Sequence, residues 1–96
     1  MSIPVVRVSD TCSGHGCFGS RMAVVGSPNV FANGIPLHRV GDVWETHCCG
    51  PVCHSGVAAT GSSTVFVNGV PVCRVGDAVD CGSTMIIGSP NVMAGG

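Results

Sequence analysis

Residues 61–80 read GSSTVFVNGVPVCRVGDAVD, and residues 26–45 read GSPNVFANGIPLHRVGDVWE. The two segments are identical at eleven of twenty positions, and most of the others exchange similar residues. Such internal repetition is the signature of an architecture built from copies of one supersecondary unit. We therefore expect the fold to consist of repeats.

A third copy of the repeat is divided between the two ends of the chain. Residues 88–96, GSPNVMAGG, match the first half of the unit, and residues 3–10, IPVVRVSD, match the second half. The chain thus looks like three repeats in a ring that is cut open within the third. A chain of 96 residues is one small domain. We expect residues 1–96 to form it with the two termini side by side.

Each full repeat carries the sequence signal of a β-hairpin. Asn33-Gly34 and Asn68-Gly69 lie between short runs rich in β-branched and aromatic residues. A type I′ turn needs positive φ at both central residues, and Asn-Gly supplies it. Pro36 and Pro71 follow two residues later, which indicates strands at an edge. The predicted fold is mainly β, with three short hairpins around a pseudo-threefold axis.

Equivalent positions of the repeats also suggest a core and a set of ion pairs. Phe31 and Phe66 are equivalent, and we expect them in the core. Val6, His38 and Cys73 occupy the same position in the three copies. Three different residues at one position suggest that it tolerates change, so we interpret His38 and Cys73 as structural or exposed residues. Each repeat ends with an Arg three residues before an Asp, and these residues are expected to form turns and ion pairs: Arg7 and Asp10, Arg39 and Asp42, and Arg74 and Asp77.

The composition excludes several classes of protein. Only 9% of residues are charged and the net charge is −1, so four scattered arginines cannot form a surface that binds nucleic acid. A hydrophobic content of 45% argues against disorder. Abundant Val and Gly argue against a helical protein. The N-terminal segment lacks the pattern of a signal peptide, and no apolar run is long enough to span a bilayer.

Zinc-competent side chains occur at near-equivalent places after the three repeat-end aspartates. His15 and His47 lie five residues beyond Asp10 and Asp42, and Cys81 lies four beyond Asp77. A pseudo-threefold arrangement would direct all three at the axis, and the longest loop adds His54. Three His and one Cys form a closed tetrahedral set that suits a structural Zn²⁺. The donor set does not distinguish zinc from iron.

The other cysteines leave alternatives open. Cys48, Cys49 and Cys53 surround His47 and His54, and any of them would be able to replace a histidine as a ligand. Cys12 and Cys17 flank His15 in the same way. These extra cysteines would serve as disulfides, as small buried residues or as a second metal site. An odd count of seven without an export signal favours metal binding in a reducing cytoplasm.

No catalytic constellation stands out in the sequence. Neither a nucleophile elbow nor an H-E-x-x-H motif is present. A small zinc metalloenzyme would need a general base, for which His38 and Glu45 are the candidates. A disulfide-stapled secreted module is the other alternative. We expect a protein without enzymatic activity.

The repeat G-S-x-x-V-F-x-N-G-x-P-x-x-R-V-G-D resembles that of the PAAR family of spike-tip proteins. The naming motif reads Pro36-Leu37-His38-Arg39 and Pro71-Val72-Cys73-Arg74, with a degenerate copy at Pro4-Val5-Val6-Arg7. Both central alanines are missing from every copy, whereas the Asn-Gly turn and the Val-Gly-Asp ending match. The resemblance covers essentially the whole chain.

The resemblance implies a cone-shaped β domain with zinc near its apex, held by His15, His47, His54 and Cys81. It also implies a partner, the trimeric β-helical spike of a type VI secretion system or a contractile-tailed phage, with one chain per trimer. Some relatives carry effector domains, and the tight span of the repeats between Met1 and Gly96 predicts a bare tip. We expect synthesis in the cytoplasm, assembly at the spike tip and transient contact with the target envelope during piercing.

Overall fold

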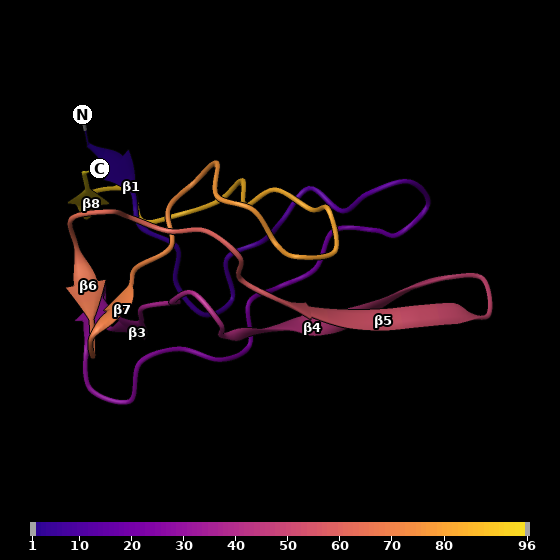
Figure 1. The fold of residues 1–96 in the computed structure, drawn as a ribbon, viewed down its shortest axis with the longest axis horizontal. Helices are drawn as coiled ribbons and strands as arrows, with labels where there is room; N and C mark the ends of the chain where they lie inside the picture. The colour runs from indigo at the N-terminus through magenta and orange to yellow at the C-terminus, as the bar shows by residue number, and fades with distance from the viewer. Residues whose placement is uncertain (1, 96) are drawn as a thin grey trace.

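Three short hairpins lie together at one end of the molecule, and the loops between them extend toward the other end (Figure 1). The computed structural model describes residues 2–95, and its principal-axis extents are 38 × 26 × 22 Å. The described residues form eight strands: β1 (Ile3–Pro4), β2 (Phe31–Ala32), β3 (Ile35–Pro36), β4 (Val43–Cys49), β5 (Val52–Val57), β6 (Phe66–Val67), β7 (Val70–Pro71) and β8 (Met93–Ala94). The mainly β fold class is therefore confirmed.

The two Asn-Gly pairs form the predicted hairpin turns. Asn33 and Gly34 have φ values of 57° and 75°, and Asn68 and Gly69 have φ values of 56° and 76°. Positive φ at both central residues is the geometry of a type I′ turn, which matches the twist of the flanking strands. The turns join β2 to β3 and β6 to β7 as antiparallel pairs.

The third hairpin is made from the two ends of the chain. β1 pairs antiparallel with β8, so that Ile3 lies opposite Ala94 and Pro4 lies opposite Met93. This register is the one that β2 and β3 use, in which Phe31 lies opposite Pro36. Figure 1 shows the N- and C-termini side by side at this end.

Backbone hydrogen bonds join the three hairpins into a closed ring. The amide of Val6 donates to Cys73, the amide of Cys73 donates to His38, and the amide of His38 donates to Val6, over 2.9–3.0 Å. These three residues occupy the same position in the three copies. One two-residue hairpin is marginal by itself, and the cyclic bonding lets each hairpin stabilise the next.

The core consists of layers in which equivalent positions have complementary sizes. Trp44 packs in one cluster with Cys12 and Val79, its counterparts in the other repeats. Met85 packs in the same cluster with two counterpart alanines, Ala23 and Ala58. One large side chain and two small ones fill each layer, as close packing requires.

The prediction that the two repeat phenylalanines are core residues was wrong. Phe31 and Phe66 are 53% and 55% exposed, and their counterpart Met93 is 45% exposed. Successive strand residues point to opposite faces, and the inward position belongs to Ala32, Val67 and Ala94. The hairpins therefore present a ring of three exposed apolar side chains.

His38 and Cys73 are structural residues, but the option that they are exposed was wrong, because both are fully buried. The Nδ1 of His38 lies 2.7 Å from the carbonyl oxygen of Val25 and donates to it, and the ring packs edge-on against Trp44 at a centroid distance of 5.1 Å. Burial lowers the pKa of His38. Burial also raises the pKa of the Cys73 thiol.

The free energy of unfolding should decrease as the pH is lowered, because His38 is buried in its neutral form. A histidine whose pKa is lower in the folded state binds fewer protons there than in the unfolded chain, so stability is full above the unfolded pKa of about 6.5 and is lost as pH falls below it. The loss has a slope of up to about 1.4 kcal/mol per pH unit. Denaturant unfolding of the wild type and of His38→Val between pH 8 and pH 5 measures it.

The valine variant is the appropriate comparison, because Val6 already occupies the equivalent position. Every other histidine is present in both proteins, so the difference between the two pH profiles isolates His38. Parallel profiles would contradict the assignment.

The predicted ion pairs are present in all three repeats. Arg7 and Asp10 lie 2.8 Å apart, as do Arg39 and Asp42, and Arg74 lies 3.2 Å from Asp77. In each pair the carboxylate also accepts a hydrogen bond from the backbone N–H of its arginine. Each aspartate thus closes a local turn and neutralises a largely buried guanidinium.

Gly88 lies where one repeat meets the next, and replacing it with alanine should be destabilising. A Cβ at this position would lie 2.7 Å from the carbonyl oxygen of Val5, which already accepts the amide of Ser89. Overpacking of this kind costs about 1–3 kcal/mol. Gly19→Ala is the matched control, since its Cβ would meet no atom within 4 Å. Equal unfolding free energies for both variants would contradict the packing argument.

One longer hairpin extends away from the ring. β4 pairs antiparallel with β5, with an irregular register between Trp44 and His47. It projects at the end of the molecule opposite to the three short hairpins (Figure 1). Within residues 2–95 there is no helix of sufficient length and apolar character to cross a membrane.

Candidate metal centre

The structure brings together all four residues that the sequence analysis selected as metal ligands. His15, His47, His54 and Cys81 each offer one ligand atom, and these atoms all lie within 4.8 Å of one another. His47 is buried, and the other three residues are half-buried. We call this group the quartet.

Three local structures place the four members of the quartet. His47 on β4 lies directly opposite His54 on β5, so both imidazoles project from one face of the hairpin. His15 lies in a tight turn, in which it exchanges backbone hydrogen bonds with Phe18. Cys81 lies in the turn where the amide of Gly82 donates to Val79.

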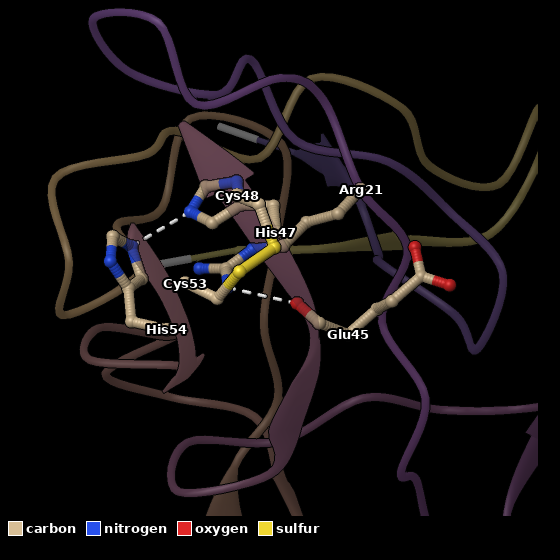
Figure 2. Close-up of a disulfide and its surroundings, with 6 residues drawn as sticks. All are labelled: Arg21, Glu45, His47, Cys48, Cys53 and His54. Atoms are coloured by element: carbon tan, nitrogen blue, oxygen red, sulfur yellow. Dashed lines mark hydrogen bonds between the residues drawn. A yellow bond between two sulfur atoms is a disulfide. The ribbon is translucent and has the colours of Figure 1, made fainter. Parts of the chain in front are cut away.

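The three imidazoles converge through their Nε2 atoms. The Nε2 of His54 lies 3.0 Å from that of His15 and 2.8 Å from that of His47. Figure 2 shows the His47 and His54 rings directed at each other from neighbouring strands. Ligand atoms around a tetrahedral zinc are about 3.3–3.6 Å apart. The convergence is close to what such an ion requires.

The hydrogen bonding of His47 prepares it to bind a cation. Its Nδ1 lies 2.8 Å from the carbonyl oxygen of Gly19 and donates to it, so the lone pair of the neutral ring is on the Nε2 atom that faces the quartet. A metal-binding histidine typically has its second nitrogen fixed in this way. Partial burial, followed by the charges of His47 and His15, lowers the pKa of His54 and favours its neutral form.

Three neutral imidazoles cannot satisfy one another in this arrangement. The Nε2 of His54 faces two other Nε2 atoms, yet a neutral ring has at most one proton on this nitrogen. A cation between the rings would accept all the lone pairs together with the Cys81 sulfur. The donor set therefore fits a metal ion.

Phe18 covers the imidazoles, and the sequence analysis did not select it. Its ring centroid lies 4.3 Å from that of His54, 4.8 Å from that of His15 and 5.0 Å from that of His47. An apolar ring at this position limits the access of water to the site. Phe18 has no counterpart in the repeat motif, so only its closeness to His15 in the sequence would have drawn attention to it.

The remaining cysteines fall into two of the three classes left open by the sequence. Disulfides join Cys17 to Cys49 and Cys48 to Cys53. Cys12 and Cys73 are free and buried. Burial alone would raise the pKa of the Cys12 thiol, but hydrogen bonds from Gly14, Arg21 and Ser83 outweigh it and lower the pKa. The structure thus combines disulfide staples with the quartet.

The two disulfides lie on opposite faces of the β4–β5 hairpin. Cys48 and Cys49 are adjacent on β4, and adjacent strand residues point to opposite sides. Cys49 shares a face with His47, so the bond from Cys49 to Cys17 ties the His15 turn to the ligand-bearing face. Figure 2 shows the other disulfide, Cys48–Cys53, beside the two histidines.

A comparison with protein families gives a match to the family model described as PAAR motif, over residues 19–87. A comparison with curated proteins gives no match. The matched segment includes both full repeats and three members of the quartet, His47, His54 and Cys81.

Proposed function

Because the chain belongs to the PAAR-motif family, whose proteins sit at the spike tips of contractile injection systems, we propose that it caps a trimeric β-helical spike and is stabilised by one zinc ion. We further propose that residues 1–96 act as a single PAAR-like domain. Its three copies are residues 26–45, residues 61–80, and the split copy formed by residues 88–96 and 3–10. The pairing of β1 with β8 supports this division.

We propose that the ring of exposed apolar side chains is the surface that contacts the spike. Phe31, Phe66 and Met93 are equivalent in the three repeats and are each about half exposed. Three equal contacts around a pseudo-threefold axis match a partner with true threefold symmetry. One chain would therefore contact all three spike subunits, which end in strand edges that need covering.

A zinc ion in the quartet would stabilise the end of the molecule that lies opposite to the three short hairpins. Residues 13–20 and 45–57, which lie around the quartet, contribute no buried apolar side chain to the core, and metal binding supplies folding free energy in small domains. His15, His47, His54 and Cys81 provide four ligands, so no coordination position is left for a catalytic water. Of the two bases considered for an enzyme, His38 is buried away from solvent and Glu45 is exposed. We therefore propose a non-enzymatic role in envelope piercing.

Binding stoichiometry tests the proposal. The purified chain is mixed with the trimeric β-helical spike protein of its own contractile system, and the complex is measured by size-exclusion chromatography with light scattering. One chain per trimer is expected. Three chains per trimer, or no complex, would count against the capping model.

A variant pair locates the binding surface. Phe31→Asp combined with Phe66→Asp should abolish the complex, because two charges would be buried against the spike. Val52→Asp is the matched control, since Val52 is 60% exposed on the distant β4–β5 hairpin and should leave binding unchanged.

A further inference from the structure

Arg21 is a buried arginine with an unusual set of partners. It is 2% exposed, and the other three arginines of the chain each pair with an aspartate. Among the described residues, Arg21 has no carboxylate within ion-pair distance. Burying a guanidinium without a carboxylate to neutralise it is costly, so its position needs an explanation.

The guanidinium of Arg21 bonds to two of the segments that hold the quartet. Nη1 donates to the backbone oxygen of Glu45 on β4 over 2.9 Å, and Nη2 donates to the Sγ of Cys81 over 2.6 Å. Figure 2 shows the bond to the Glu45 backbone and the Glu45 carboxylate directed away from it. Arg21 itself follows the turn that holds His15. One side chain thus connects three ligand-bearing segments.

The pseudo-threefold repeat leaves room for this side chain. Arg21 is equivalent by repeat offset to Gly56 and Ser83, both of which are buried. A Cβ at Gly56 would lie 2.8 Å from Nη2 of Arg21 and 2.9 Å from Oδ1 of Asp80. Asp80 uses that oxygen to accept the amide of Val57. The absent side chain on β5 therefore creates space for the guanidinium.

We infer that Arg21 is a positioning residue of the metal centre, which holds the Cys81 sulfur toward the three imidazoles. This inference rests on the proposed metal site. A cysteine bound to a metal is a thiolate, and a charge-assisted hydrogen bond from a guanidinium fixes its orientation. Removing such an outer partner typically lowers metal affinity 10–100-fold.

Cobalt substitution tests this role directly. Wild type, Arg21→Lys and Arg21→Met are loaded with Co²⁺, and their sulfur-to-cobalt charge-transfer bands and affinities are measured by competition with a chelator. Arg21→Met should bind Co²⁺ 10–100-fold more weakly. Its band should move to longer wavelength, because the sulfur lone pairs lose a donor. Arg21→Lys should recover part of both changes.

Two further variants keep the test decisive. Arg39→Met removes an arginine from an Arg–Asp pair and should leave the cobalt spectrum unchanged. If Arg21→Met does not fold, Gly56→Ala takes its place. The added methyl group would push the Arg21 guanidinium away from its position, so the band should shift in the same direction. A folded Arg21→Met or Gly56→Ala with wild-type spectrum and affinity would overturn the inference. A wild type without any charge-transfer band would instead refute the proposed site.

Discussion

His15→Ala and Cys81→Ala should each lose the bound metal and several kcal/mol of stability. Each replacement removes one of the four proposed ligands, and the free energy of binding a structural metal is also free energy of folding. A ligand present at 1,000 times its Kd stabilises the folded state by about 4 kcal/mol. For a domain of this size, each kcal/mol lowers the Tm by about 4–8 °C. Metal analysis and thermal unfolding of the purified variants measure both effects.

His38→Ala is the matched control for these variants. His38 is fully buried and lies outside the quartet. Its loss leaves a cavity and costs stability, yet metal content should stay at one ion per chain. If the two ligand variants kept the wild-type metal content and Tm, the quartet would not be a metal site.

The sequence predicted the hairpins and three members of the quartet because they follow from the repeat. Asn-Gly turns fix the hairpin geometry locally, so Asn33 and Asn68 were sufficient to place two of them. His15, His47 and Cys81 lie at nearly equal distances from repeat-end aspartates. A ring of repeats converts equal offsets along the chain into positions around one axis.

The same repeat did not reveal which apolar residues point inward. Phe31 and Ala32 are adjacent in β2 and both are apolar, so hydrophobicity alone does not assign their faces. The structure buries Ala32 in one cluster with its counterparts Val67 and Ala94, and leaves the phenylalanine outside. The exposed ring is consistent with a surface that another protein covers.

Other features outside the repeat motif had no sequence signal. Arg21 corresponds to Gly56 and Ser83 in the other copies, and no sequence rule indicates that a guanidinium fills the space above a distant glycine. The disulfide pairing was equally undetermined, because adjacent cysteines at 48 and 49 have partners on opposite faces of the hairpin. These features depend on three-dimensional packing.

Removing the Cys17–Cys49 disulfide should cost more stability than removing Cys48–Cys53. The first bond spans 32 residues and the second spans 5. In the chain-entropy model, these loops correspond to about 3–4 and about 2 kcal/mol. Denaturant unfolding of the Cys17→Ser/Cys49→Ser and Cys48→Ser/Cys53→Ser variants, each with and without metal, measures the two contributions.

The two variants should also differ in how firmly they hold the metal. Cys17–Cys49 ties the His15 turn to the face of β4 that carries His47, whereas Cys48–Cys53 closes the hairpin on its other face. Release of the His15 turn should therefore speed metal transfer to a chelator, and opening the other disulfide should leave that rate near the wild-type value. Equal rates for both variants would show that the staple on the ligand face does not preorganise the quartet, because the loss of a staple elsewhere would then have the same effect.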